Sequence, residues 1–139
     1  MSGLIRHGAR AAVVLLALAA WGTGCGGKPA PSDTDQVRST LVAFGRATAR
    51  HDYRALCDRL LAPTLVDKLR RIGLPCVQAL EQGLGGVRGA KLSVGRITVD
   101  GDTARAQVRT SAEGQQPSQD TVDLRRVNGS WRIASLAGT

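Results

Sequence analysis

Three cysteines and one short polar run are the side chains of this sequence with the most distinctive chemistry. The cysteines are Cys25, Cys57 and Cys76, and the polar run is His51-Asp52-Tyr53. A thiol can carry lipid, form a disulfide, bind a metal or act as a nucleophile, and His, Asp and Tyr side chains can transfer protons. Which chemistry applies depends on the elements that carry these residues.

The first 24 residues have the pattern of a secretory signal peptide. Arg6, His7 and Arg10 give a positive start, residues 11–21 are wholly apolar, and small residues follow. The apolar run is too short to cross a membrane, which takes about 20 apolar residues. We therefore expect residues 1–24 to be removed and the domain to lie in an extracytoplasmic, oxidising compartment.

The segment around the first cysteine resembles the end of a bacterial lipobox, in which a lipoprotein signal peptidase cleaves before a cysteine that carries lipid. That segment is Thr23-Gly24-Cys25, although Gly22 stands where a large aliphatic residue is usual. Residues 25–32 continue with the Gly- and Pro-rich composition of a flexible tether. We predict that Cys25 carries lipid and anchors the chain to the outer face of the cell membrane. The alternative is cleavage after Ala20, which gives a soluble secreted protein.

Lipidation of Cys25 would leave Cys57 and Cys76 as an even pair, and this parity favours a disulfide in an oxidising compartment. Cys57 lies on the apolar stripe of a predicted helix, and Cys76 follows Pro75 at the start of another. The spacing fits no zinc pattern, so we expect no metal. A reactive thiol beside His51 is the alternative.

Apolar residues at helical spacing predict four helices between residues 33 and 83. A capping box at Asp33 and Gln36 is expected to open the first. The predicted inward residues are Val37, Leu41, Phe44 and Thr48 in a helix at 33–50; Tyr53, Leu56, Cys57 and Leu60 in a second that Pro63 stops; Leu65, Leu69 and Ile72 in a third that Gly73 ends; and Val77 and Leu80 in a fourth at 75–83.

After Gly89, apolar residues alternate with polar ones, which predicts antiparallel strands. A change of phase at Gly95-Arg96 predicts a bulge, Gly101-Asp102 and Asn128-Gly129 predict hairpin turns, and a polar loop is expected at 113–119. Helices followed by an antiparallel meander predict an α+β fold. The strand residues expected to point inward are Ala104, Ala106, Val108, Val122, Leu124 and Ile133, with Trp131 packed beneath the last hairpin.

The phrase VRSTLVAFGRATARHDYRALCDRLLAP and the closing VNGSWRIASL resemble the NTF2-like (SnoaL-like) superfamily, and within it the small secreted lipoproteins of actinobacteria. The resemblance covers residues 33–139. It implies one cone-shaped domain in which N-terminal helices close a curved antiparallel sheet over a pocket. The residues expected to line this pocket are Phe44, Tyr53, Leu56, Val108, Leu124 and Trp131.

Enzymes of this superfamily resemble one another in placing acids, His or Tyr inside the cone. The strand residues expected to point inward carry no group that exchanges a proton. Asp52 is expected to cap the second helix, Tyr53 to anchor the core and His51 to be solvated. We therefore predict a non-catalytic domain without a cofactor, which binds a small apolar ligand or an envelope protein. The alternative is a SnoaL-like isomerase, dehydratase or hydrolase that uses His51, Asp52 or Tyr53.

The 139 residues carry a net charge of +8, and removal of Arg6 and Arg10 with the leader lowers it to +6. Aromatic residues are too few and too scattered to form a row on which bases stack, so we expect no nucleic-acid partner. A solvated surface is expected, with attraction to anionic lipid headgroups or wall polymers near the anchor as the alternative. We also expect a monomer, because burial across a two-fold interface would be costly for the outward residues Arg105, Arg109, Asp123 and Arg125.

Overall fold

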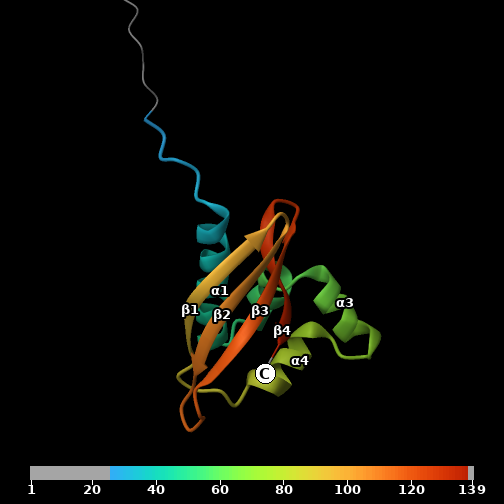
Figure 1. Cartoon of the computed structure of the whole chain (residues 1–139). Coiled ribbons are helices and arrows are strands. Elements are labelled where there is room, and N and C mark those ends of the chain that lie inside the picture. Colours follow the sequence, from blue (N-terminus) through green and yellow to red (C-terminus); the bar gives the residue numbers. More distant parts are fainter. Residues whose placement is uncertain (1–25, 138–139) are drawn as a thin grey trace, which may run out of the picture.

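The computed structural model describes residues 26–137, so the predicted signal peptide and Cys25 lie outside the described residues (Figure 1). Residues 26–32 form neither helix nor strand. The helices that follow are α1 (Asp33–Ala49), α2 (Tyr53–Ala55), the π-helix η1 (Leu56–Leu60), α3 (Pro63–Arg71) and α4 (Cys76–Leu84). The strands are β1 (Lys91–Asp100), β2 (Thr103–Ser111), β3 (Ser118–Val127) and β4 (Ser130–Ala137).

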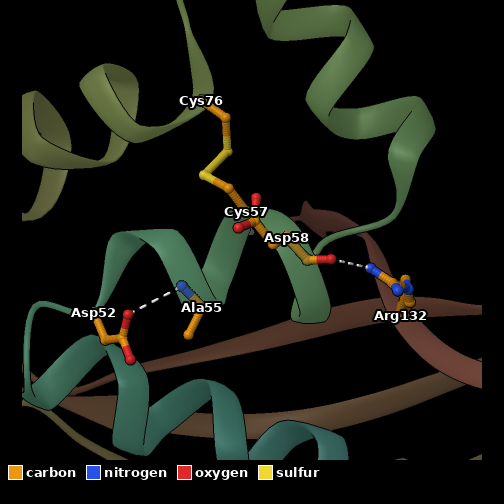
Figure 2. The surroundings of a disulfide bond; sticks show 6 residues. All are labelled: Asp52, Ala55, Cys57, Asp58, Cys76 and Arg132. Carbon is orange, nitrogen blue, oxygen red and sulfur yellow. Dashed lines mark hydrogen bonds between the residues drawn. A yellow bond between two sulfur atoms is a disulfide. The ribbon is translucent and has the colours of Figure 1, made fainter.

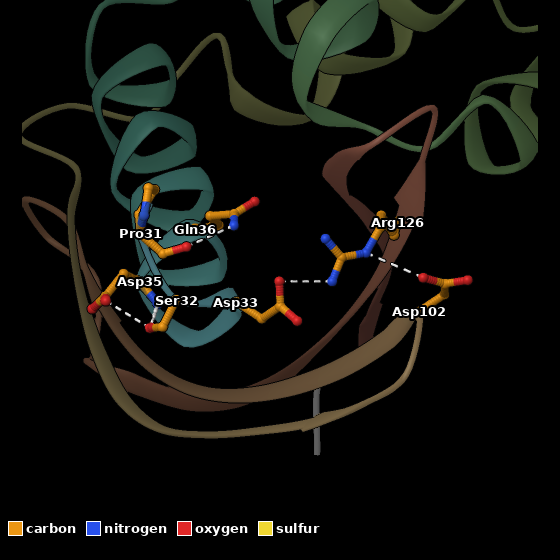
Figure 3. Close-up of polar contacts among 7 residues, drawn as sticks. All are labelled: Pro31, Ser32, Asp33, Asp35, Gln36, Asp102 and Arg126. Carbon is orange, nitrogen blue, oxygen red and sulfur yellow. Dashed lines mark hydrogen bonds and ion pairs between the residues drawn. The ribbon is translucent and has the colours of Figure 1, made fainter. Parts of the chain in front are cut away.

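The four strands form one antiparallel sheet in the order β1-β2-β3-β4, as the alternating pattern predicts. At the β3–β4 hairpin, Asn128 and Gly129 both have positive φ values, 49° and 77°, which a type I′ turn requires. The register of β1 against β2 shifts between Val94 and Ile97, so the predicted bulge is confirmed. The sheet curls around α1 (Figure 3), and the chain has the predicted α+β class.

The core lies between α1 and the concave face of the sheet. Val37 and Leu41 of α1 are fully buried there. The helix approaches β1 closely at Gly45, where a Cβ atom would lie 3.0 Å from the Cβ of Leu92. The strand residues predicted to point inward are all buried, namely Ala104, Ala106, Val108, Val122, Leu124, Trp131 and Ile133.

The N-cap of α1 differs from the prediction. Ser32 is the cap, and its Oγ accepts a hydrogen bond of 3.1 Å from the amide of Asp35 (Figure 3). The side chain of Gln36 instead donates to the carbonyl of Pro31. A capping side chain must stand just outside the helix to reach the free amide of the third residue, so the capping box expected at Asp33 is displaced by one residue.

The predicted second helix is a short α-turn that widens into η1, and Pro63 does not end it. The chain leaves η1 because Leu61 and Ala62 become extended and pair with β4. The amide of Ala62 donates to the carbonyl of Ile133 over 2.7 Å, and Leu61 forms a parallel bridge with the same residue. Pro63 occupies the first turn of α3, where its missing amide hydrogen costs no helical hydrogen bond.

Two residues predicted to face inward, Ile72 and Val77, are exposed, with 72% and 37% of their surface accessible. Ile72 caps the C-terminus of α3, and Gly73 follows with a φ of 78°. This left-handed residue turns the chain away before Ile72 can pack. In α4, Cys76 and Leu80 contact the core, and Val77 lies about 100° around the helix from Cys76, on its outer side.

Candidate functional site

A pocket of about 610 Å³ lies between the helices and the concave face of the sheet. Sites for small molecules have volumes of about 300–1,000 Å³. The walls come from α1, α3, α4 and the first three strands, and they are mainly apolar. The larger apolar side chains in the lining include Phe44, Leu65, Leu69, Leu80, Leu92 and Val108.

A row of polar side chains lines this pocket on β2 and β3. The Ser118 Oγ donates a hydrogen bond of 2.6 Å to Asp120 Oδ2, and the hydroxyls of Thr110 and Ser118 are 2.8 Å apart. The strand register places Thr110 beside Ser118 and Val108 beside Asp120. Within residues 26–137, Asp120 Oδ1 has no hydrogen-bond partner. The pocket therefore combines apolar walls with one carboxylate oxygen that is free to accept a hydrogen bond.

Asp120 and Ser118 are absent from the residues that the sequence predicted for the site, although a signal for both existed. Side chains two apart on a strand share a face, so the inward positions Val122 and Leu124 imply that Asp120 and Ser118 also face the pocket. The polar loop expected at 113–119 concealed this, because Ser118 in fact pairs with Thr110 and opens β3. The expectation that no inward strand residue exchanges a proton is therefore wrong at Asp120.

Only Phe44 and Val108, of the six residues expected to line the pocket, do so. Leu124 and Trp131 are buried in the core, toward the end of the sheet that α1 enters. Leu56 is also fully buried, in a smaller cluster with Ala47 and Ala55, and Tyr53 packs against that cluster. These four residues therefore support the fold and lie outside the lining of the pocket.

The backbone of the His51-Asp52-Tyr53 run forms the junction between α1 and α2. The amide of His51 donates to the carbonyl of Thr48, and the amide of Asp52 donates to that of Ala47. Together with the positive φ of His51, 56°, these bonds form a Schellman motif that ends α1. Asp52 Oδ1 accepts a 3.0 Å hydrogen bond from the amide of Ala55, so its predicted role as the N-cap of α2 is confirmed (Figure 2).

The imidazole of His51 is half-buried, and the prediction of a solvated side chain is wrong. Its Nδ1 lies 2.6 Å from the Tyr53 hydroxyl, and its Nε2 lies 3.5 Å from Arg88 Nη1. These partners are a phenol and a guanidinium, and none of the three residues lines the pocket. The run therefore does not bring a His–carboxylate pair into the cone.

Cys57 in η1 and Cys76 at the start of α4 form a disulfide, the pairing that parity predicts (Figure 2). Their Cα atoms are 6.0 Å apart, and both residues are buried. Close by, Arg132 Nη1 donates a 2.7 Å hydrogen bond to the carbonyl of Asp58, which joins η1 to β4. The disulfide thus links α4, one wall of the pocket, to the sheet through η1, and neither thiol is free to act as a nucleophile.

Groups of three or more His, Cys, Asp or Glu side chains that could hold a metal ion do not occur among residues 26–137. Over the same part of the chain, every helix is too short or too polar to cross a membrane.

The fold is similar to several solved structures. An NTF2-like protein of unknown function from Shewanella baltica matches 73% of this chain and 87% of its own, with a TM-score of 0.54 and 16% identity. An NTF2-like protein of unknown function from Silicibacter pomeroyi matches 70% of this chain and 87% of its own, with a TM-score of 0.50 and 18% identity. A de novo designed NTF2 fold protein matches 75% of this chain and 85% of its own, with a TM-score of 0.51 and 17% identity. No protein-family model matches the sequence, and no curated protein does. The helices, the curved four-stranded sheet and these likenesses show that the chain has the NTF2-like fold.

Proposed function

We propose that this chain is a lipid-anchored, extracytoplasmic domain that binds a small ligand in its cone without transforming it. The observation that carries the proposal is the pocket of about 610 Å³, which has apolar walls and the polar row of Thr110, Ser118 and Asp120. Apolar walls bind the body of a ligand through the hydrophobic effect, and a few placed polar groups select its head.

The free oxygen of Asp120 selects the head group. Asp120 Oδ2 already accepts from Ser118, so Oδ1 is left for a ligand that donates a hydrogen bond. A primary amine donates and is also cationic, so it gains a charge-assisted hydrogen bond, whereas an alcohol gains a neutral donor only. Lys91 also lies in the lining, and a carboxylate ligand would use this residue in place of Asp120.

The alternative of a SnoaL-like enzyme requires proton-transferring groups that converge on the substrate. His51, Asp52 and Tyr53 do not line the pocket, and Asp120 is hydrogen-bonded to two hydroxyl groups in series. This arrangement supports binding over catalysis by those residues.

Decylamine, decanol and decanoate share one alkyl length and differ in the head group, so they test the proposal as calorimetric titrants. We expect decylamine to bind most tightly. Asp120→Asn should weaken the binding of decylamine relative to that of decanol by about tenfold, the usual scale of one charge-assisted hydrogen bond. Ala79→Phe should block all three, because Ala79 lines the pocket. The matched control is Gln78→Phe, an exposed neighbour on the same helix.

Equal binding of the three compounds would show that Asp120 does not select the head group. Equal binding to the Ala79→Phe and Gln78→Phe variants would show that the pocket is not a ligand site. Turnover of a bound compound that survives His51→Gln but not Asp120→Asn would replace the binding role with a catalytic one.

The anchor is the second part of the proposal. It is supported by Thr23-Gly24-Cys25 and by the Gly- and Pro-rich residues 26–32, which lead into α1 without helix or strand. Cys25→Ser should release the chain from the membrane fraction of cells. If the Ser variant stays in that fraction at both low and high salt, the anchor does not exist.

A further inference from the structure

An exposed groove on the molecule is lined by four arginines. Arg38, Arg46 and Arg50 stand on one broad stripe along α1, because rotations of about 80° from Arg38 to Arg46 and about 40° from Arg46 to Arg50 keep all three on one side of the helix. Arg59 of η1 lines the same groove, whose volume is about 640 Å³. We call these four residues and the space between them the arginine groove. Arg50, the C-cap of α1, lies twelve positions after Arg38, so the stripe is about 18 Å long.

The protein offsets only part of the positive charge of this groove. Its two carboxylates are Asp35, which accepts the Ser32 hydroxyl over 2.6 Å, and Asp52, which caps α2. Set against four guanidinium groups, they leave the lining with a net charge of +2. Within the described chain, the side chains of Arg46, Arg50 and Arg59 take part in no hydrogen bond or ion pair.

Guanidinium groups that form no ion pair within the protein select phosphate. The planar fork of arginine matches a phosphate group with two parallel hydrogen bonds. An exposed apolar residue among the arginines adds contact with lipid. Val42 is such a residue, because it lines the groove and is 37% exposed.

The arginine groove lies close to the proposed anchor, and this position indicates which surface the groove contacts. Residues 26–32 lead directly into the start of α1 (Figure 1), and Cys25 precedes them in the sequence. Seven residues span at most about 25 Å when fully extended, a distance comparable to the length of the stripe. A membrane that holds Cys25 is therefore within reach of all four arginines.

We infer that the arginine groove binds the phosphate headgroups of anionic membrane lipids, so that α1 lies against the membrane surface. This inference rests on the proposed anchor for the proximity of the membrane. It adds an orientation, because contact through α1 and η1 fixes which side of the domain faces the lipid.

The full chain with Cys25→Ser carries no lipid, so its binding to vesicles tests the groove separately from the anchor. Sedimentation would compare vesicles of phosphatidylcholine alone with vesicles that also contain phosphatidylglycerol. Binding to the neutral vesicles measures what the apolar residues 11–21 contribute, and this contribution is common to all variants.

The groove variant is Arg46→Gln/Arg50→Gln/Arg59→Gln, which keeps Arg38 because its Nη1 donates to the carbonyl of Val94. We expect a loss of affinity for anionic vesicles of about fivefold for each arginine, and on the order of a hundredfold in total. The matched control removes three arginines from the outer face of the sheet that are also exposed and that form no ion pair among the described residues, and it should lose less than about fivefold. The control residues are Arg96, Arg109 and Arg125, each changed to Gln.

Thermal melts identify any variant that is unfolded. If the triple variant fails to fold, the single variants Arg46→Gln and Arg50→Gln replace it, and each should lower the affinity for anionic vesicles by about fivefold. Equal losses in the two triple variants would reduce the effect to net charge and overturn the inference. Equal binding of the parent to neutral and anionic vesicles would also overturn it, as would tighter binding to inorganic polyphosphate than to vesicles at the same phosphate concentration. Binding through the groove is electrostatic and weakens at high salt, so release of Cys25→Ser from cell membranes at high salt still tests the anchor separately.

Discussion

The guanidinium carbon of Arg126 lies 4.5 Å from the centroid of the Trp131 ring. The same guanidinium forms ion pairs with Asp33 at the start of α1, over 2.7 Å, and with Asp102 in the β1–β2 hairpin, over 3.1 Å (Figure 3). Its hydrogen bond to Asp33 is the main cause that raises the pKa of Arg126. One side chain thus joins α1, the β1–β2 hairpin and the buried ring of the β3–β4 hairpin.

Arg126→Met should lower the melting temperature, because it leaves Asp33 and Asp102 without a cation and removes the cation–π contact while keeping a long apolar stem. Arg125→Met is the control, since Arg125 is exposed and its side chain forms none of these contacts. Thermal unfolding followed by circular dichroism measures both. Similar melting temperatures for the two variants would show that the contacts of Arg126 do not stabilise the fold.

Removal of the disulfide by Cys57→Ala/Cys76→Ala should lower the free energy of unfolding by about 3 kcal/mol, since it frees a loop between residues 19 apart in the sequence. Urea denaturation measures the change. Reductant should destabilise the parent to a similar extent and leave the double variant unaffected. Two free thiols titrated in the unfolded, unreduced parent would mean that the bond does not form.

Two helical glycines should respond differently to the same substitution. Gly45→Val should destabilise by about 1–3 kcal/mol, because its Cβ would lie 3.0 Å from Leu92 Cβ and force α1 away from β1. At Gly83 a Cβ meets nothing within 4 Å, so Gly83→Val should change stability by less than about 0.5 kcal/mol. Urea denaturation of both variants is the test, and equal effects would contradict the close packing at Gly45.

The carboxylate of Asp123 should make stability depend on pH in the acid range. Hydrogen bonds from Arg105 and Ser135, each 2.9 Å long, lower the pKa of Asp123 below its ordinary value. A lowered folded-state pKa contributes stability that is complete above the unfolded pKa, near 4, and is lost as the pH falls through the folded value.

Asp123→Asn should therefore be less stable than the parent near neutral pH, by less than about 1 kcal/mol because the pair is largely exposed. The difference should shrink below about pH 4. Unfolding by urea between acid and neutral pH measures it, and a difference that does not vary with pH would contradict the lowered pKa.

The sequence alone determined the features that neighbouring residues control. The alternation around Ala104 and Val122, the phase change at Gly95-Arg96 and the turn at Asn128-Gly129 each depend on residues within a few positions of one another. Local backbone preference and side-chain period are enough to predict such features, and the structure confirms them. The pairing of Cys57 with Cys76 also followed from local stripes and from parity.

The tertiary structure decided what depends on contacts between distant segments. Ile72 and Val77 fit helical stripes, yet the turn at Gly73 and the disulfide at Cys76 orient their helices so that both are exposed. Asp120 becomes a pocket residue because the register of β3 against β2 extends the sheet to Ser118. Likewise the arginine groove exists only where η1 packs beside α1, because a periodic pattern shows which side of an element is apolar but not which other element will lie against it.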